Sequence, residues 1–179
     1  PTGQVYLDGV RVPAENILGE LNRGINVLMS GLDVERAVFA ALPLGQARRA
    51  MELSLQYARD RSQFGRPIAS FQLIQAKLAD MYTQIEAARL MVWKAGSMLG
   101  KMERGGKGTE LHKLAAAALL FSAEVAEKVC YEAVQIHGGN GYSKEFEVNR
   151  LYRDVRLGTI GAGTSEIRRL IIARELLGL

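Results

Sequence analysis

One stretch decides the fold of this 179-residue chain, residues 71–102, which reads FQLIQAKLADMYTQIEAARLMVWKAGSMLGKM. Its apolar side chains recur at alternating spacings of three and four residues: Phe71, Ile74, Leu78, Met81, Ile85, Ala88, Val92, Ala95, Leu99 and Met102. This spacing places them on one face of a helix and is typical of helices that pack in bundles. At 1.5 Å per residue, the helix is about 50 Å long.

One further long helix is expected before this stretch and another after it. The first runs over about 24–61 and is interrupted at Pro43, because proline lacks a backbone N–H. The second runs from a cap at Thr109 to His137, where a run of glycines ends it. Shorter helices are expected over about 145–156 and after Thr164. We therefore predict an all-α protein built as a four-helix up-down bundle, preceded by a short β-strand remnant.

The first twenty residues have a different pattern. Residues 4–13 alternate apolar and polar side chains around Asp8 and Gly9, as the end of a β-sheet would. A lone hairpin is barely stable in water. We therefore expect two parts, the end of a β-domain over 1–20 and a helical bundle over 21–179, cut from a longer protein.

Composition limits the possible functions. The chain is 48% hydrophobic and 23% charged, as in globular domains, and the net charge of +4 is weak evidence for binding nucleic acid. Its single cysteine, Cys130, excludes an internal disulfide and fits a reducing compartment. No apolar run approaches the ~20 residues that span a bilayer.

Glu35 is the first candidate for chemistry. It shares a helical face with four apolar residues, Leu28, Leu32, Phe39 and Leu42. Burial on such a face disfavours the charged form of a carboxylate, which suits a general base that takes a proton from carbon. The alternative is a structural glutamate paired with a base such as Arg36.

Three short stretches could contact a ligand. Arg61, Gln63 and Phe64 offer a cation and an aromatic ring in one turn. The glycines of QIHGGNG, residues 135–141, and IGAGTSEI, residues 160–167, let a ligand approach the backbone. The second of these also leads into a helix N-terminus. Each stretch by itself is more typical of an ordinary helix end, and the spacing of His112 and His137 predicts no zinc site.

Taken together and in this order, these stretches resemble the C-terminal half of the acyl-CoA dehydrogenase family. The resemblance covers essentially the whole chain. Its motifs are RSQFG (61–65), FQ (71–72), LADM (78–81), QIHGGNGY (135–142), RD (153–154) and GTSEI (163–167). Within the family the narrower similarity is to the isovaleryl-CoA dehydrogenases, through MSGLDVER (29–36) and IGAGTSE (160–166).

The resemblance implies a reaction and its cofactor. Family members remove two hydrogens from the α and β carbons of an acyl-CoA, one as a proton and one as a hydride that FAD accepts. The implied partners are the acyl-CoA, an electron transfer flavoprotein that reoxidises the flavin, and other copies of the chain in a homotetramer. Nucleic acid and membrane insertion are not expected. The implied location is the cytoplasm in a bacterium or the mitochondrial matrix in a eukaryote, without secretion.

One position separates the branches of the family. Most members carry the catalytic glutamate just before the Gly-Thr of the last motif, where this chain has Ala162. In the isovaleryl and long-chain branches the base comes from the first bundle helix, and the matching residue here is Glu35. The resemblance therefore implies that Glu35 is the base. A small residue at Ala162 would leave room for a short branched acyl chain.

The same resemblance assigns the remaining site residues. Asp33 and Arg36 would contact the CoA moiety, and Ala162 and Gly163 the thioester end. Asn26 stands where the isovaleryl pattern has a tyrosine that touches substrate. Residues expected at FAD are Arg61, Gln63, Phe64, Gln72, Gln135, Gly138, Gly139, Thr164 and Glu166. Some of these would reach the flavin of a neighbouring subunit.

Three other functions stay open at this point. The chain could serve a dehydrogenase for another short- or medium-chain acyl-CoA, which a substrate panel would reveal. As an isolated piece it could be a catalytically silent helical oligomerisation module, which would bind no flavin. A basic nucleic-acid-binding bundle is a third possibility, which absent or salt-insensitive DNA binding would eliminate.

Overall fold

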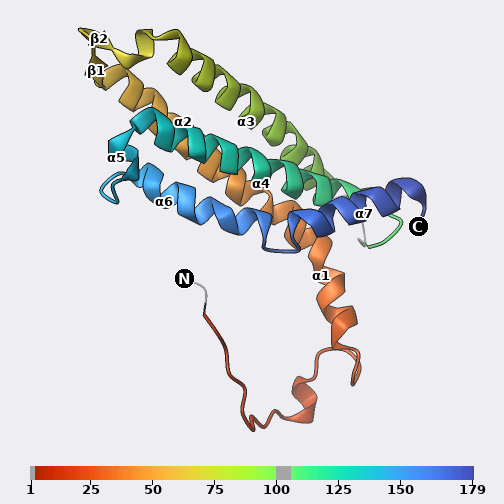
Figure 1. Cartoon of the computed structure of the whole chain (residues 1–179). Coiled ribbons are helices and arrows are strands. Elements are labelled where there is room, and N and C mark those ends of the chain that lie inside the picture. Colours follow the sequence, from red (N-terminus) through yellow and green to blue (C-terminus); the bar gives the residue numbers. More distant parts are fainter. Residues whose placement is uncertain (1–2, 100–105) are drawn as a thin grey trace.

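The computed structural model describes residues 3–99 and 106–179, and its described part is a helical bundle (Figure 1). The α-helices are α1 (Gly24–Phe39), α2 (Ala41–Asp60), α3 (Gln72–Leu99), α4 (Glu110–His137), α5 (Gly139–Tyr142), α6 (Glu147–Asp154) and α7 (Ser165–Leu177). The 3-10 helices are η1 (Ala14–Asn16), η2 (Ile68–Ser70) and η3 (Val155–Thr159). A two-stranded antiparallel sheet consists of β1 (Ser62–Gln63) and β2 (Arg66–Pro67). The predicted all-α bundle is confirmed.

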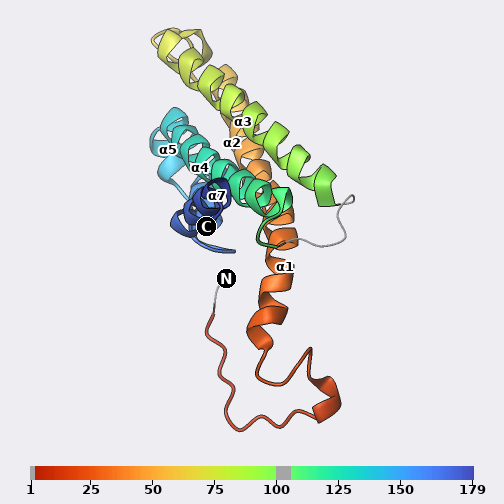
Figure 2. The same ribbon diagram turned by 90° about the vertical axis from the view of Figure 1, so that its right-hand side faces the viewer.

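Helix α4 is the axis of the bundle. Helices α2 and α3 run alongside one side of it, and α6 and α7 lie along the other (Figures 1 and 2). Fully buried alanines such as Ala115, Ala118, Ala126 and Ala133 line α4 and let its neighbours approach closely. A helix that is apolar around most of its circumference belongs in the interior of a domain.

The predicted limits of α4 are confirmed, and local chemistry explains them. The Thr109 hydroxyl accepts a hydrogen bond from the His112 N–H (3.1 Å), which satisfies a free donor of the first turn. At the other end, Gly138 has a φ of 59°, a conformation that glycine adopts easily and that stops the helix after His137.

The interruption predicted at Pro43 occurs three residues earlier. Helix α1 ends at Phe39 and α2 begins at Ala41, so that Pro43 lies in the first turn of α2. In that turn a missing N–H costs no hydrogen bond. The predicted stripe of α3 is also confirmed as far as Leu99, with Met81, Ile85, Ala88, Val92 and Ala95 buried. Met102 lies outside the described residues.

The β-strand predicted over residues 4–13 does not form in the described chain, and the assignment of residues 1–20 to the end of a β-domain stays a prediction. Residues 3–13 contain no strand, and η1 is the first regular element of this segment. The segment is exposed throughout and extends away from the bundle (Figures 1 and 2). A strand needs a partner for its N–H and C=O groups, and the described residues supply none here.

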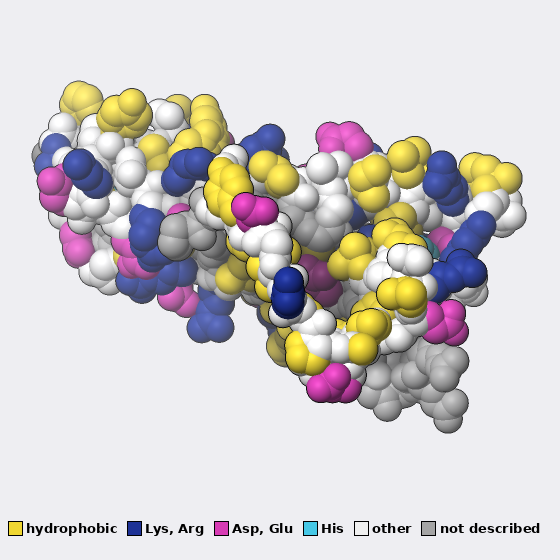
Figure 3. Space-filling model, turned by 90° about the horizontal axis from the view of Figure 1, so that it is seen from below, with side chains coloured by type: hydrophobic (Ala, Val, Ile, Leu, Met, Phe, Trp, Pro, Cys, Tyr) yellow, Lys and Arg dark blue, Asp and Glu magenta, His cyan; other side chains and the backbone are white. Residues whose placement is uncertain are grey.

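The orientation predicted for α1 is also wrong. Its buried residues are Asp33, Arg36 and Ala37, whereas Leu28 and Glu35 are exposed. The fully buried contacts of α1 come from Ala37 and a buried ion pair, and of the large residues in the predicted stripe Phe39 packs against the core while Leu28 does not. Seen from below, where α1 and the N-terminal segment lie in Figure 1, much of the visible surface is hydrophobic (Figure 3).

Within the described residues, no helix is both long enough and apolar enough to cross a membrane.

Candidate functional site

The site residues named from the sequence fall into two groups at different places in the bundle. The first group lies where α1 meets the turn before α7, and we call it the α1–α7 junction: Asp33, Glu35, Arg36, Ala162, Gly163, Thr164 and Glu166. The second lies where the β1–β2 hairpin meets the end of α4, and we call it the hairpin end: Arg61, Gln63, Phe64, Gln72, Gln135, Gly138 and Gly139. Asn26 belongs to neither group, and it is exposed in the first turn of α1.

Arg36 links α1 to the turn before α7. Its guanidinium is buried and pairs with the Asp33 carboxylate at 3.2 Å, one helical turn away. Its Nε donates a hydrogen bond to the carbonyl oxygen of Ala162 (3.2 Å). Asp33 and Arg36, the two residues expected to contact CoA, therefore bond to each other, and Arg36 also bonds to Ala162. Their contact with CoA stays a prediction.

The Asp33 carboxylate contacts three hydrogen-bond donors. Besides Arg36, its carboxylate accepts from the backbone N–H of Gly106 (2.7 Å), and it lies 2.6 Å from Nδ1 of His112. It thereby fastens the segment before α4 to α1. Sequence reasoning missed His112 at this site, because 79 residues separate it from Asp33 and no local motif connects them.

Glu35 is a carboxylate of this junction that forms no ion pair with the described residues. It is exposed, and it directly precedes Arg36, whose side chain holds the turn at Ala162. The expectation that it lies on a buried face of this chain is wrong, because the buried residues of α1 are Asp33, Arg36 and Ala37. An accessible carboxylate beside a fixed turn can still take a proton from a bound molecule.

The turn at residues 161–163 has an unusual backbone. Ala162 has a φ of 55° and Gly163 a φ of 94°. A Cβ added at Gly161 would lie 3.3 Å from the Leu157 carbonyl oxygen and 3.3 Å from the Phe39 ring, so a side chain there would crowd both. The left-handed conformation costs a residue such as alanine about 1–2 kcal/mol, and surrounding contacts must hold it.

The start of α7 is capped as the sequence predicts. The Thr164 hydroxyl oxygen accepts from the Ile167 N–H (3.4 Å). Glu166 is exposed in the first turn, and hydrogen bonds from its own N–H and from the Thr164 hydroxyl lower the pKa of its carboxyl. A negative charge at this place is favourable to the helix dipole.

The hairpin end presents an aromatic ring to solvent. Phe64 and Gly65 both have positive φ values, 53° and 79°, and form the tight turn between β1 and β2. The Phe64 side chain is 93% exposed, which is unusual for a residue of this size. The Arg66 guanidinium of the same hairpin lies over the Phe71 ring, with its Cζ atom 4.5 Å from the ring centroid.

Two cavities at the hairpin end bring most of the predicted FAD residues together. One, of about 790 Å³, has Gln63, Phe64 and Gln72 in its lining. The other, of about 340 Å³, has Arg61, Gln63, Gly138 and Gly139. Both cavities share Gln63, Ile68 and Ile136, so they are neighbours. Gln135 is exposed on the last turn of α4 and lines neither cavity.

His137 contributes to the smaller cavity. Its ring stacks on Tyr57, with centroids 4.2 Å apart, and Nδ1 donates to the Ala133 carbonyl oxygen at 2.7 Å. Burial lowers the pKa of His137, so the ring is neutral at pH 7. Because Nδ1 carries the proton in this bond, Nε2 is a hydrogen-bond acceptor.

The hairpin end suits an anionic ligand that carries an aromatic ring system. Arg61 supplies a cation, and Phe64 an open ring face. Apart from their chain neighbours and nearby helix backbone, no atom of the described residues lies within 4 Å of a Cβ added at Gly138 or Gly139, so a ligand could approach their backbone directly. These are the properties expected of residues that hold a flavin dinucleotide.

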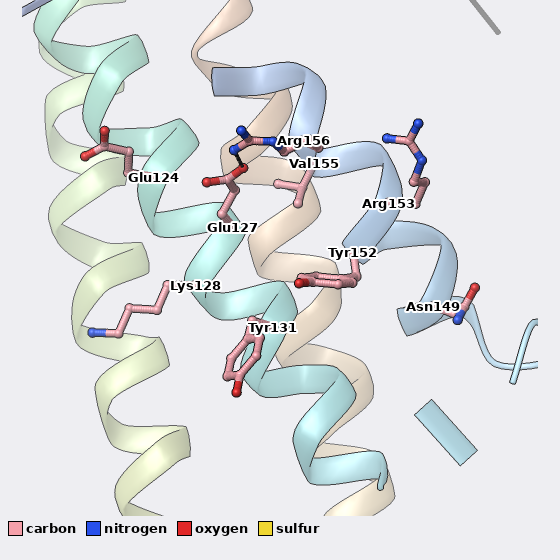
Figure 4. A pocket seen from close by; sticks show the side chains of 9 residues that line it. All are labelled: Glu124, Glu127, Lys128, Tyr131, Asn149, Tyr152, Arg153, Val155 and Arg156. Carbon is pink, nitrogen blue, oxygen red and sulfur yellow. Dashed lines mark hydrogen bonds and ion pairs between the residues drawn. The ribbon is translucent and has the colours of Figure 1, made fainter. Parts of the chain in front are cut away.

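A larger groove contains none of the predicted site residues. It measures about 840 Å³, lies between α4 and α6–η3, and carries acids, bases and tyrosines together (Figure 4). The Arg156–Glu127 ion pair crosses one end of it. Neighbouring charges of opposite sign make the groove less suited to a single anion than the hairpin end.

Comparisons with known proteins agree on one family. The family model described as "Acyl-CoA dehydrogenase, C-terminal domain" matches residues 22–177. The probable acyl-CoA dehydrogenase YngJ of Bacillus subtilis is 48% identical, over 98% of this chain and 45% of its own length. The mitochondrial isovaleryl-CoA dehydrogenase of Oryza sativa is 47% identical, over 98% of this chain and 41% of its own.

A solved structure agrees with these sequences. Butyryl-CoA dehydrogenase from Megasphaera elsdenii superposes with a TM-score of 0.85 at 42% identity, covering 93% of this chain and 42% of that one. The chain thus spans less than half the length of the relatives that it matches.

Proposed function

Because the chain belongs to the acyl-CoA dehydrogenase family, we propose that it serves an enzyme that dehydrogenates a short branched acyl-CoA, with isovaleryl-CoA as the foremost substrate. The observation that carries the proposal is that Arg36, the residue after Glu35, contacts the turn at Ala162. Glu35 is an exposed carboxylate on α1, and the next residue, Arg36, holds the turn at Ala162, which has no carboxylate of its own.

In the proposed reaction, Glu35 takes the proton from the α carbon of the thioester. Arg36 and Asp33 keep α1 fixed to the turn at Ala162, so the base is held at a constant distance from the acyl end of the substrate. FAD, the cofactor of this family, supplies the hydride acceptor. The small side chain of Ala162 leaves space where most family members carry a glutamate.

The cofactor residues point to a site shared between subunits. Helix α4 is 28 residues long, about 42 Å, with His112 near its start and His137 at its end. His112 contacts Asp33 at the α1–α7 junction, and His137 lines the cavity at the hairpin end. The two groups therefore lie at opposite ends of α4. We propose that the hairpin end of one copy holds the flavin that serves Glu35 of another.

Two partners belong to the same proposal. A site that two copies complete implies a homo-oligomer, and we propose the tetramer implied by the family resemblance. An electron transfer flavoprotein would reoxidise the flavin.

We further propose that residues 1–20 end a β-domain, which would supply the partner that this segment lacks in the described chain.

The first experiment replaces the base. In the full-length protein, Glu35→Gln is expected to abolish bleaching of the flavin absorbance by isovaleryl-CoA under anaerobic conditions while FAD stays bound. Glu52→Gln is the matched control, since Glu52 is a half-exposed carboxylate on α2 away from both groups. Normal bleaching in the Glu35 variant would show that another group is the base.

A substrate panel then tests the acyl specificity. The wild-type protein is mixed with isovaleryl-CoA, butyryl-CoA and a straight medium-chain acyl-CoA, and the rate of bleaching is compared. The highest rate with isovaleryl-CoA supports the proposal. A higher rate with a straight-chain substrate would retain the reaction and overturn the branched-chain assignment.

A second candidate function is a helical oligomerisation module without catalysis. The exposed apolar side chains of α1, including Ile25, Leu28 and Met29, favour it, because such surfaces are usually covered by another protein surface. Flavin content separates the two functions. Full-length protein that purifies as a defined oligomer without flavin would favour the module, and bound FAD would exclude it.

A further inference from the structure

Arg168 is the largest fully buried side chain among the described residues, and no sequence motif marked it. It lies on α7 with an exposed fraction of 0%. One of its terminal nitrogens, Nη2, donates a hydrogen bond to the carbonyl oxygen of Gly161. Burial and the nearby Arg36 lower the pKa of Arg168 to about 10, so the group is still charged at pH 7. A buried charge is costly, so its presence requires an explanation.

Among the described residues, no carboxylate forms an ion pair with this guanidinium, although the charge of Glu124 favours its protonated form. None of the ion pairs found among residues 3–99 and 106–179 includes Arg168. Its Nε and Nη1 have no hydrogen-bond partner in the same residues. The carbonyl of Gly161 is therefore the one acceptor that the described chain gives to this guanidinium.

Arg36 makes the matching contact on the next residue. Its Nε donates to the carbonyl oxygen of Ala162, so two buried guanidiniums hold two consecutive carbonyl groups. These carbonyls flank the α carbon of Ala162, which has the left-handed φ of 55°. A strained conformation of this kind persists only where several contacts impose it.

We propose that Arg168 is a positioning residue of the acyl site. By holding the Gly161 carbonyl, it keeps Ala162 in the left-handed turn and so sets the spacing between this turn and Glu35. This inference rests on the proposed function, because it assigns the turn and Glu35 to one substrate. Arg36 anchors the turn to the helix that carries the base, and Arg168 anchors it to α7.

Two substitutions test the role of the guanidinium. Arg168→Met removes both charge and donors, and a change of this kind at a buried ion is often tolerated by the fold. Arg168→Lys keeps the charge and one donor on a shorter, more strongly hydrated group. We expect kcat with isovaleryl-CoA to fall by about 10²-fold in the methionine variant and about tenfold in the lysine variant. KM and FAD content are expected to stay near wild type, because Arg168 is too deeply buried to contact either ligand.

Arg174→Lys is the matched control, since Arg174 is an exposed arginine near the end of the same helix. It is expected to leave kcat unchanged. Wild-type kcat in the methionine variant would overturn the proposal, as would a loss confined to KM. If the methionine variant does not fold, the lysine variant decides alone, and wild-type turnover in it overturns the proposal.

A second measurement does not depend on catalysis. Hydrogen exchange of a peptide that covers residues 157–164 is compared between wild type and Arg168→Lys, with the Arg174→Lys control. The proposal expects faster exchange of this peptide alone, because the Gly161 carbonyl is held less firmly. Unchanged exchange overturns it. If the wild-type protein oxidises no acyl-CoA, the proposed function fails, and hydrogen exchange still tests the clamp.

Discussion

At the scale of single residues, this protein keeps several polar side chains where apolar ones would be expected. Asp33, Arg36, His137 and Arg168 are all buried. Three of them bond to the backbone of another segment: Asp33 to Gly106, Arg36 to Ala162 and Arg168 to Gly161. His137 bonds to the Ala133 carbonyl of its own helix. Most of these bonds fix a loop or a turn that the proposed function needs, so burial of these residues serves to position backbone.

His137 leads to a prediction about pH. Because burial lowers its pKa, the folded protein binds this proton less readily than the unfolded chain, whose histidines titrate near about 6.5. The stabilising contribution is therefore complete above that pH and is lost as pH falls through it towards the lower folded value. We expect the free energy of unfolding to decrease on acidification in this window.

Urea unfolding at several pH values between 5 and 8 measures this effect in wild type and in His137→Asn, which keeps a side-chain donor. The difference between the two proteins should be constant above neutral pH and should shrink as the pH falls below about 6.5. A difference that is independent of pH would show that His137 does not remain neutral for the reason given.

At the scale of secondary-structure elements, Asp33 takes part in the α1–α4 contact, because it pairs with Arg36 within α1 and contacts His112 of α4. Asp33→Asn would leave the buried guanidinium of Arg36 without its counter-charge. Removing one partner of a buried pair is strongly destabilising, and we expect a loss of about 3 kcal/mol in the free energy of unfolding.

Glu52→Gln is the control for this prediction. Its partner Arg48 is 77% exposed, and such surface pairs contribute less than about 1 kcal/mol. Both variants are compared by denaturant titration. Equal effects of the two substitutions would show that the Asp33–Arg36 pair is no more important than a surface pair.

The packing of α5 against α4 gives another prediction. A Cβ at Gly141 would lie 2.5 Å from the Val134 carbonyl oxygen and 2.9 Å from the His137 Cβ, both of which belong to α4. Gly141→Ala is expected to destabilise the protein by about 1–3 kcal/mol, because backbone atoms cannot move away cheaply.

Gly45→Ala serves as the comparison, since nothing lies within 4 Å of a Cβ added at Gly45 in α2. Alanine there should be neutral or should stabilise the protein by up to about 1 kcal/mol. Thermal denaturation of both variants provides the test. A Gly141→Ala protein as stable as wild type would mean that α5 is not packed as described.

At the scale of the whole molecule, the two groups of site residues lie at opposite ends of α4, and the proposed function combines them from different copies. This arrangement predicts complementation between two inactive variants. Glu35→Gln removes the base, and Arg61→Ala removes a cation of the hairpin end. In a mixed assembly, one kind of site combines an intact Glu35 with an intact Arg61.

Co-expression of the two variants should therefore restore flavin bleaching by isovaleryl-CoA. The control is co-expression of Glu35→Gln with a double variant carrying Glu35→Gln and Arg61→Ala, because that mixture contains no intact base. If the first mixture is as inactive as its separate components, the site is not shared between copies.

Much of the architecture was predictable from the sequence because it depends on local chemistry. The α3 stripe, the Thr109 cap and the glycines after His137 act within a few residues, and all three predictions are confirmed. At the hairpin end, the predicted residues lie close in sequence to the turns that place them. Six of the seven line the two cavities there, and Gln135 is the exception.

The side of α1 that is buried could not be predicted from periodicity. Large apolar residues usually mark the buried face, but here Ala37 and the Asp33–Arg36 pair occupy it and Leu28 is exposed. The same limit applies to β-pairing. Residues 4–13 have a strand pattern, yet none of them lies in a strand, because pairing requires a neighbouring strand.

The sequence by itself determined the helices, their ends, the family and the residues expected to do chemistry, because propensity, capping and motifs act over short distances. Only the tertiary structure decided that His112 joins Asp33, that Arg36 and Arg168 hold neighbouring carbonyls, and that the site residues divide into two groups. These are contacts between segments far apart in the chain. They depend on how the helices pack, and no local pattern records that arrangement.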